Sequence, residues 1–441
     1  MATNKSGISK LSAGIKGAFR IGQTVRILAQ TGADWLMGER PPAPILLRQT
    51  FERLGTTYIK LGQFIASSPS VFPDDYVAEF QLCLDKTTPV PFYTMKRVLE
   101  QELGKSLETV FAEFDPVPLA SASIAQVYAA KLVSGEDVVV KVQKPGVENI
   151  LLTDLNFLYV GARILEYFVP NLSMASLSAI VDEIQKGMLA ECDFYQEAKN
   201  IADFHKFLDE TGNTQATAPK VYEQASTMRV LTMERFYGVP FTDLESIQHI
   251  VDDSESTLIT AMNTWFSSLL FCDSFHADVH AGNLLVLKDG RVGFIDFGIV
   301  GRIKPSTWES VSKFIYAIGQ ENYREMAEAM LGIGMTDEEV NTDRLAQDIE
   351  DLYSRMDRVM PDVDLSAGDM ASVSEHEVNK VMMDLVGIGK RHGIHFPREF
   401  ALLLKQLLYF DRYVRLLAME SNIYMDERLN ITPDMDWNMI H

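Results

Sequence analysis

HADVHAGN at residues 276–283, followed by DFG at residues 296–298, is the strongest indication of the fold of this chain. It holds three oxygen-rich side chains: Asp278 can orient or deprotonate a hydroxyl, and Asn283 and Asp296 can hold Mg²⁺ against nucleotide phosphates. The apolar runs 284–286 and 292–295 flank turn residues 288–290, which predicts two short strands between the motifs. The stretch therefore predicts a centre for phosphoryl transfer from ATP.

A second pair of strands is predicted at 126–132 and 138–143, joined by a turn at 134–137. Lys141 lies among valines in the second strand, where a lysine is costly unless it has an anionic partner or reaches solvent at a sheet edge. The spacing from Asp278 to Asn283 is that of a kinase catalytic loop, which favours a lysine that contacts the α- and β-phosphates and is held by a helix glutamate. The acid-rich helical stretch 177–204 offers Glu197 or Glu191 as this partner.

Two further segments are predicted to contact the nucleotide. Residues 119–127, LASASIAQV, stand where a kinase has its glycine-rich loop; alanine lacks the φ freedom of glycine, so this loop should be stiffer. The phosphate-binding candidates in it are Ala120, Ser121, Ala122 and Ser123. At 228–238 an apolar strand runs into a Gly-Val-Pro break, which is typical of an interlobe hinge with the backbone near Glu234 and Phe236 facing adenine, or of an ordinary strand and turn.

Composition and charge narrow the function classes. The chain has 441 residues, 47% of them hydrophobic, and a net charge of −21, so no overall basic field exists to meet nucleic-acid phosphates. Its three cysteines form no C-x-x-C pair, which argues against a disulfide framework or a cysteine zinc site and favours a reducing compartment. No apolar run reaches the roughly 18 residues of a membrane span. We expect an intracellular protein that is soluble or peripherally bound to a membrane.

The N-terminal segment, residues 1–40, is basic, with no acidic residue before Asp34. Its apolar residues recur at helical spacing, which predicts an amphipathic helix on an anionic membrane or a frayed tail leading into a helix packed on the body. A secretory signal is not indicated, because no continuous apolar core is present, whereas an organelle transit peptide stays open.

Several motifs together resemble one family. They are KLGQ at 60–63, the alanine-rich loop at 120–127, ECD at 191–193 with EAKN at 197–200, and the HADVHAGN segment itself. This ordered set is similar to the UbiB/AarF-like atypical kinases, often called the ADCK family. The resemblance covers about 49–300 and, more weakly, 397–417. Val279 and Ala281 depart from it, since the family usually has prolines there.

The resemblance implies an α+β, protein-kinase-like two-lobed fold with a helical N-terminal extension and a mostly helical C-terminal lobe. The expected domains are the basic segment 1–40, a helical extension 41–108, an N-lobe 109–236 and a C-lobe 237–441. Lys60 and Gln63 would lie where a peptide substrate would bind, with Lys60 near the carboxylates of Glu191 and Asp193, and Glu197 would be the partner of Lys141. ATP and Mg²⁺ would be the cofactors, and a lipid or prenylquinone-related molecule a partner.

The segment after Gly298 bears on the acceptor, because a helical pattern starts near Pro305 and leaves little room for a peptide platform. A small molecule, a lipid or water is therefore the expected acceptor. Three functions stay open: an atypical kinase or ATPase in quinone biosynthesis or lipid homeostasis, a nucleotide-binding scaffold, and a small-molecule kinase. The rest of the C-terminal half is expected to be helical without a further catalytic constellation, with an exposed loop at 361–377 and no metal site at His392 and His395.

Overall fold

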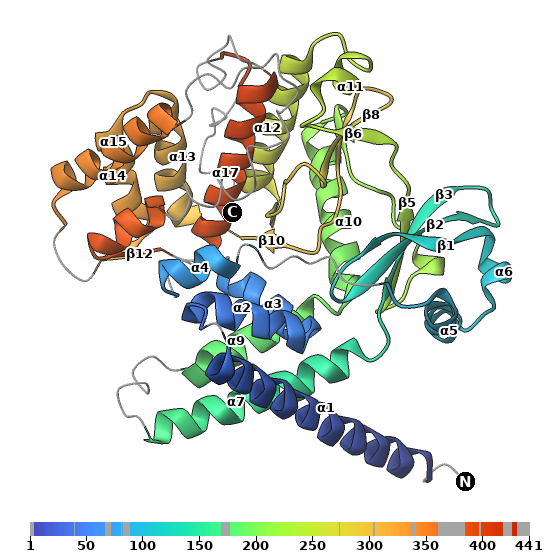
Figure 1. Ribbon diagram of the computed structural model, residues 1–441. Helices are drawn as coiled ribbons and strands as arrows, with labels where there is room; N and C mark the ends of the chain where they lie inside the picture. The colour runs from blue at the N-terminus through green and yellow to red at the C-terminus, as the bar shows by residue number, and fades with distance from the viewer. Residues whose placement is uncertain are drawn as a thin grey trace. The chain divides into compact units, whose positions relative to one another are not determined.

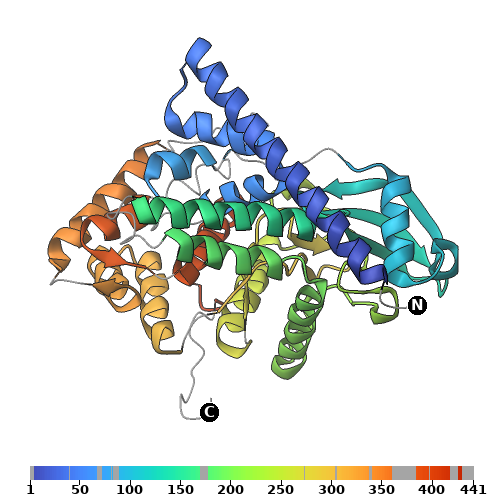
Figure 2. The same cartoon turned by 90° about the horizontal axis from the view of Figure 1, so that it is seen from below.

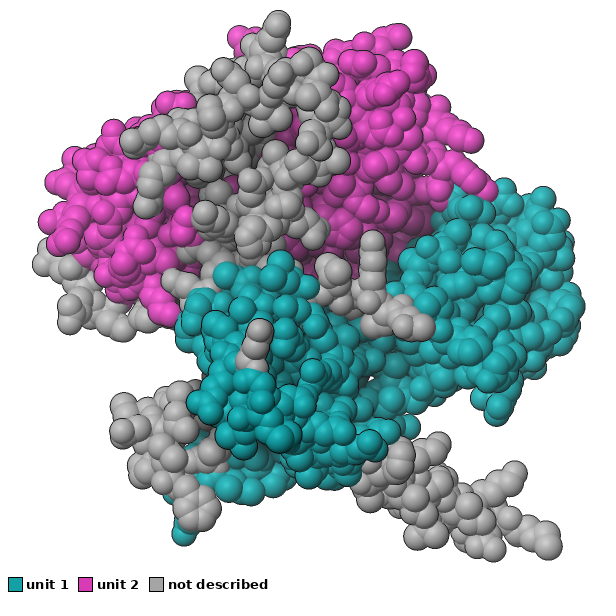
Figure 3. Space-filling view, in the orientation of Figure 1, with its two compact units in different colours: residues 1–67, 73–198, 221–235 teal, residues 68–72, 199–220, 236–441 magenta. Residues whose placement is uncertain are grey.

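The computed structural model describes residues 4–38, 40–66, 72–80, 82, 89–168, 177–272, 274–302, 305–336, 340–359, 384–396, 398–417 and 426–429. As predicted, these residues form a mixed α+β structure in which small sheets are accompanied by many helices (Figure 1). The chain divides into two compact units (Figure 3). Unit 1 comprises residues 1–67, 73–198 and 221–235, and unit 2 comprises residues 68–72, 199–220 and 236–441.

Unit 1 contains an antiparallel sheet with the strand order β1-β2-β3-β5. Its strands are β1 (Phe111–Ser121), β2 (Ala125–Leu132), β3 (Asp137–Gln143) and β5 (Val230–Glu234). Helix α5 (Phe92–Leu103) packs on this sheet and buries Met95 and Leu99 completely against Tyr128 and the valines of β3 (Figure 1). The two strands predicted around 134–137 match β2 and β3 to within one residue, because a β-branched run beside a Ser-Gly turn favours a hairpin.

The other helices of unit 1 are α1 (Asn4–Met37), α2 (Ala43–Leu54), α3 (Thr56–Ala66), α4 (Asp74–Phe80), α6 (Leu107–Val110), α7 (Val147–Phe168), α9 (Leu177–Ala190) and the start of α10 (Phe194–Thr211). Helix α7 packs against both α1 and α9 (Figures 1 and 2). A buried ion pair joins α1 to α7: Arg20 donates to the two carboxylate oxygens of Asp154 at 3.0 and 2.7 Å. Thr57 of α3 donates to the same carboxylate at 2.7 Å, so one acidic residue ties three helices together.

Unit 2 contains a second sheet with the order β4-β9-β8-β6. Its strands are β4 (Ala216–Thr217), β6 (Gly238–Pro240), β8 (Leu284–Leu287) and β9 (Val292–Phe294). Strands β8 and β9 are the predicted hairpin, and Gly290 in its turn has a positive φ of 82°. Two shorter pairs are also antiparallel: β7 (Phe275–His276) with β10 (Val300–Gly301), and β11 (Met335–Thr336) with β12 (Ile394–His395).

The helices of unit 2 are α11 (Leu244–Gln248), α12 (Ser254–Phe271), α13 (Pro305–Gly319), α14 (Tyr323–Ile333), α15 (Thr342–Val359), a helix over 384–391, and α17 (Arg398–Leu417). Helix α12 begins where Asp253 caps the backbone N–H of Ser256, and it buries Trp265 completely. The predicted helical start at Pro305 is that of α13. None of the helices in the described ranges is long and apolar enough to cross a membrane.

Some expectations differ from the structure. Gly238–Pro240 is strand β6 instead of a chain break, because its backbone pairs with β8. Residues 119–127 are not one loop: 119–121 end β1, 125–127 begin β2, and only 122–124 form the turn. The loop predicted at 361–377 lies outside the described residues.

Candidate active site

Lys141 of β3 and Glu197 of α10 form the central ion pair of unit 1. The Nζ of Lys141 donates to both carboxylate oxygens of Glu197, at 3.0 and 2.9 Å, and the side chains are 15% and 5% exposed. The sheet register fixes the lysine, since Lys141 lies between Val127 of β2 and Leu231 of β5. A buried lysine in a central strand is tolerated because this carboxylate compensates its charge.

The glutamate is positioned by a break between two helices. Helix α9 ends at Ala190 and α10 begins at Phe194, so Glu191-Cys192-Asp193 form a turn between them. Gln143 of β3 donates to the carbonyl of Cys192 at 2.6 Å, and the Phe194 N–H donates to the carbonyl of Met228 at 3.0 Å. These bonds attach the first turn of α10 to the sheet and bring Glu197 to Lys141.

The KLGQ motif lies on α3, also in unit 1. Lys60 forms an ion pair and hydrogen bond with Glu191. Gln63 is half-buried on the same helix. Asp193 accepts a hydrogen bond from the backbone N–H of Tyr195 at 3.0 Å. The two acids of the turn therefore have different partners: Glu191 pairs with Lys60, and Asp193 accepts a hydrogen bond at the start of α10.

The alanine-rich segment forms the turn between β1 and β2. Ala120 and Ser121 are the last residues of β1, and Ala122 N–H donates to the Ala125 carbonyl at 2.9 Å to close the turn. The Ser121 hydroxyl is buried without a hydrogen-bond partner among the described residues. Ser123 is fully buried, and its carbonyl accepts from Thr56 of α3 at 3.3 Å. A buried hydroxyl without a partner, next to a turn of small residues, suits an anionic oxygen such as that of a phosphate.

Two hinge candidates lie at the point where the chain leaves unit 1. Glu234 is the last residue of β5 and pairs with Val138. Unit 1 ends at Arg235, and Phe236 is the first residue of the following part of unit 2.

In unit 2, His276 organises the HADVHAGN segment, residues 276–283. Its Nδ1 accepts from the N–H of Asp278 at 3.2 Å, and its Nε2 lies 2.9 Å from the carbonyl of Ile295. Both bonds together need the neutral ring with the proton on Nε2. Burial lowers the pKa of His276 from its usual 6.5, which favours that neutral form. The histidine thereby joins the backbone at Asp278 to the strand that precedes DFG.

Asp278 and Asn283 are also in contact. The Nδ2 of Asn283 donates to the Asp278 carbonyl at 3.0 Å and lies 3.4 Å from its Oδ2. This arrangement engages the amide nitrogen of Asn283, so its Oδ1 is the atom that could bind a cation. Burial by itself would raise the pKa of Asp278, but the positive charge of Lys405, with smaller effects from His280 and His276, holds that pKa below its usual range.

Asp296 has a left-handed backbone, with φ of 61°, which is uncommon outside glycine and costs about 1–2 kcal/mol. Its Oδ1 accepts from the Gly298 N–H at 3.3 Å. Next to it, Phe297 is buried against Phe204 and His276, and its carbonyl accepts from Asn200 of α10 at 2.9 Å. The packed phenylalanine fixes the strained residue beside it.

The donors of unit 2 suit Mg²⁺ better than a metal held by protein alone. The described residues contain no cluster of three or more His, Cys, Asp or Glu side chains that could hold a metal ion. Mg²⁺ characteristically takes one or two protein oxygen ligands and completes its shell with phosphates and water. Asn283 and Asp296 carry hard side-chain oxygens that could serve in this way.

Helix α17 brings a further set of polar residues to the HADVHAGN segment. Lys405 donates to the Oδ1 of Asp278 at 3.2 Å. The fully buried Gln406 donates to the Ala277 carbonyl and accepts from the Val279 N–H, both at 2.8 Å. The Tyr413 hydroxyl donates to the Val279 carbonyl at 2.9 Å. The sequence predicts a helical C-terminal half without a further catalytic constellation, and it does not predict these contacts of α17 with the HADVHAGN segment.

These contacts have little signal in the sequence, because Lys405 lies within an otherwise leucine-rich helical pattern that is typical of ordinary core. His392 lies 2.8 Å from the carboxylate of Asp348 on α15, a contact that the sequence also does not predict.

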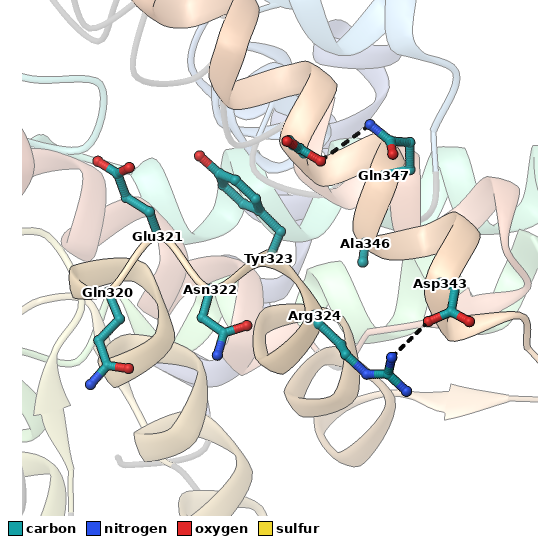
Figure 4. A pocket seen from close by; sticks show the side chains of 9 residues that line it. Gln320, Glu321, Asn322, Tyr323, Arg324, Asp343, Ala346 and Gln347 are labelled. Atoms are coloured by element: carbon teal, nitrogen blue, oxygen red, sulfur yellow. Dashed lines mark hydrogen bonds and ion pairs between the residues drawn. The ribbon is translucent and has the colours of Figure 1, made fainter.

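A surface pocket of about 480 Å³ on unit 2 lies between α14 and α15 and their flanking loops (Figure 4). Its polar lining includes an ion pair of Arg324 with Asp343 at 3.1 Å. None of the predicted site residues lines it, so it takes no part in the candidate site.

A family model described as the ABC1 atypical kinase-like domain matches residues 83–330, more than half of the chain. The chain belongs to the ABC1 atypical kinase-like family. It is 47% identical to an uncharacterized aarF domain-containing protein kinase of Arabidopsis thaliana, named chloroplastic, over 98% of this chain and 85% of that protein. It is 29% identical to a probable protein kinase UbiB of Pseudomonas aeruginosa, over 86% of this chain and 69% of that protein.

A solved Mycobacterium tuberculosis protein, in complex with erythromycin, is similar in structure with a TM-score of 0.48 and 22% sequence identity, over 81% of this chain and 91% of that one. Membership of the ABC1 family confirms the predicted resemblance to UbiB/AarF-like kinases and the kinase-like α+β fold. A family defined by a kinase-like domain is consistent with the use of ATP.

Proposed function

We propose that the chain binds ATP with Mg²⁺ and transfers or hydrolyses its γ-phosphoryl group, in support of isoprenoid-quinone biosynthesis or lipid homeostasis at a membrane surface. The observation that carries this proposal is the buried, bidentate pair of Lys141 and Glu197. An ion pair inside a sheet gains little stability over apolar residues, so chemistry is a better reason for its presence than folding. A lysine held in this way can meet the α- and β-phosphates of a nucleotide.

The other roles follow from the chemistry of each residue. Ala120 and Ser121 at the end of β1 and Ala122 and Ser123 in the turn that follows would contact phosphates, and the backbone from Glu234 to Phe236 would contact adenine. Asn283 and Asp296 would hold Mg²⁺, which neutralises phosphate charge when bound. Asp278 would orient the attacking hydroxyl or water and accept its proton. Lys60, Gln63, Glu191 and Asp193 are assigned a regulatory role.

The acceptor is proposed to be a lipid, another small molecule or water. After DFG, β10 occupies Val300–Gly301 and α13 begins at Pro305, which leaves a short segment for holding a peptide. The name probable protein kinase UbiB of one relative supports phosphoryl transfer, and the chloroplastic location in the name of another supports an organelle.

Peripheral membrane contact is proposed through apolar side chains exposed on two helices of unit 1. On α1 they are Ile21, Val25, Leu28, Trp35, Leu36 and Met37, and on α7 they are Tyr159, Val160, Ile164 and Tyr167. Exposed apolar residues repeated along a helix are typical of a surface that enters a lipid interface. Cosedimentation with phosphatidylglycerol vesicles should fall for Ile164→Asp and stay unchanged for Tyr316→Asp, an exposed aromatic on α13. Equal binding of both variants would contradict this assignment.

The test of catalysis is ATP hydrolysis with and without Mg²⁺. The wild type should require the metal, and Asp296→Asn should lose roughly 100-fold or more of the rate because a charged ligand is lost. Asp289→Asn is the matched control, since Asp289 lies in the turn of the hairpin that precedes Asp296, is 52% exposed and pairs with Arg291. Hydrolysis that survives Asp296→Asn would refute the metal assignment.

A second candidate, a nucleotide-binding scaffold without meaningful turnover, is favoured by the contact of Lys60 with Glu191, which ties the KLGQ helix to the turn before α10. Single-turnover measurement with labelled ATP separates the two. Phosphate release much slower than nucleotide exchange would support the scaffold, whereas release at a comparable rate would support the enzyme.

A further inference from the structure

Helix α17 contacts the side chain of Asp278, the residue proposed above to orient the attacking hydroxyl or water. The Nζ of Lys405 lies 3.2 Å from the Oδ1 of Asp278, and the two side chains are 26% and 19% exposed. The same ammonium lies 5.5 Å from the ring centroid of Tyr409, one turn further along α17. Lys405 is thus held between a carboxylate and an aromatic ring, instead of extending into solvent as helix lysines usually do.

The backbone on either side of Asp278 is held by the neighbouring residue of the same helix. Gln406 bonds to the carbonyl of Ala277 and to the N–H of Val279, which precede and follow Asp278. Two consecutive residues of α17 therefore hold Asp278: Gln406 bonds to the backbone on either side of it, and Lys405 bonds to its carboxylate. A packing contact alone does not need this division between backbone and side chain.

The HADVHAGN segment carries no lysine or arginine of its own. Asp278 is surrounded by His276, His280 and Asp296 besides Lys405, and of these groups only Lys405 carries a permanent positive charge. A carboxylate that must point at a reacting hydroxyl loses rate steeply when it is misplaced, and a fixed cation beside it can hold it without reorganisation. The chain therefore recruits from α17 a cation that its own segment lacks.

We propose that Lys405 is a positioning residue for phosphoryl transfer, which holds the carboxylate of Asp278 in the orientation needed to meet the acceptor. This inference rests on the proposed function. It assigns Lys405 to the transfer step and not to nucleotide binding, because its contact is with Asp278. It also assigns a role to charge and not to size, since methionine would fill a similar volume.

The experiment compares Lys405→Met, Lys405→Arg and Lys313→Met in Mg²⁺-dependent ATP turnover. Lys405→Met should lower kcat by roughly 10- to 100-fold, as for a misplaced catalytic group, with KM for ATP within about twofold of the wild type. Lys405→Arg should recover a large part of kcat because it keeps the cation. Lys313 pairs with Glu309 at 2.7 Å on the exposed face of α13, so Lys313→Met is the control and should leave both constants unchanged.

A melting-temperature cycle with Asp278→Asn tests the contact itself. The shifts caused by Lys405→Met and Asp278→Asn should not add, because each variant removes the same pair. If the wild type turns over ATP and Lys405→Met has the same kcat, the inference is overturned and the proposed function stays intact. Additive melting shifts would have the same consequence. A wild type without Mg²⁺-dependent turnover would instead overturn the proposed function, and the role of Lys405 in transfer with it.

Discussion

Replacing Gln406 by leucine should loosen the backbone around Asp278 more than any conservative surface change. Gln406 is fully buried, and its amide is bonded to the Ala277 carbonyl, the Val279 N–H and the Leu402 carbonyl, each at 2.8 Å. Leucine has a similar volume but no polar atom, so it leaves the groups at 277 and 279 buried without these bonds. The Leu402 carbonyl belongs to α17 and keeps its place in the helix ladder.

The expected magnitude follows from those two groups. An orphaned buried backbone group costs about 1–3 kcal/mol, so two cost about 2–6 kcal/mol. Burying the extra apolar surface of leucine returns roughly 1–2 kcal/mol. The net loss should be about 3 kcal/mol, which corresponds to a roughly 100-fold larger opening equilibrium for the segment.

Hydrogen exchange measured by mass spectrometry on a peptide spanning 275–283 reads this opening directly. Exchange at the Val279 amide should accelerate by about two orders of magnitude in Gln406→Leu. Gln347→Leu is the control, because Gln347 is an exposed glutamine on α15 and its loss should change stability by less than about 0.5 kcal/mol. Unchanged protection at Val279 in Gln406→Leu would show that α17 does not hold the segment and would refute the reasoning.

Three more predictions concern other parts of the chain. Asp154→Ala should destabilise unit 1 by about 2–3 kcal/mol because it leaves Arg20 without its partner, whereas Asp34→Ala, at an exposed pair, should cost less than about 1 kcal/mol in urea unfolding. In a Cys83→Ser background, iodoacetamide at pH 8 should label Cys272 and spare Cys192, because burial raises the pKa of the Cys192 thiol to about 11 and keeps it protonated; equal labelling would contradict this. Because burial lowers the pKa of His276, the unfolded state binds more protons than the folded state below pH 6.5. The free energy of unfolding should therefore decrease by up to about 1.4 kcal/mol for each unit by which the pH falls below 6.5. Melting between pH 5 and 7.5 should show a smaller decrease in His276→Gln.

The elements that could be predicted from the sequence are those whose signal is local. The β2–β3 and β8–β9 hairpins follow from apolar runs around turn residues. Strand β6 was missed because a Gly-Val-Pro sequence is a poor strand former. It is a strand only because β8 supplies hydrogen bonds to it from a distant part of the chain.

Partner choice at Lys141 shows where local reasoning stops. The sequence predicts an acidic partner for this lysine, and both Glu191 and Glu197 are candidates within one predicted helical stretch. The structure breaks that stretch at 191–193, which directs Glu191 to Lys60 and Glu197 to Lys141. The three residues 191–193, which lie between α9 and α10, thus determine both ion pairs. The periodicity of the apolar residues does not predict this interruption of the helix.

The contact of Lys405 with Asp278 cannot be predicted for a different reason: 127 residues separate the two in the sequence. A charge taken into a fold needs an opposite charge, so the sequence can state that Asp278 requires a cation near it. It cannot say which of 40 lysines and arginines supplies it, because one lysine in a leucine-rich helix looks the same whether it faces solvent or a carboxylate. The sequence can therefore nominate the motif residues as site candidates, while the residues of α17 that contact them follow only from its packing against the HADVHAGN segment. Such supporting residues should be sought wherever a catalytic motif lacks a cation of its own.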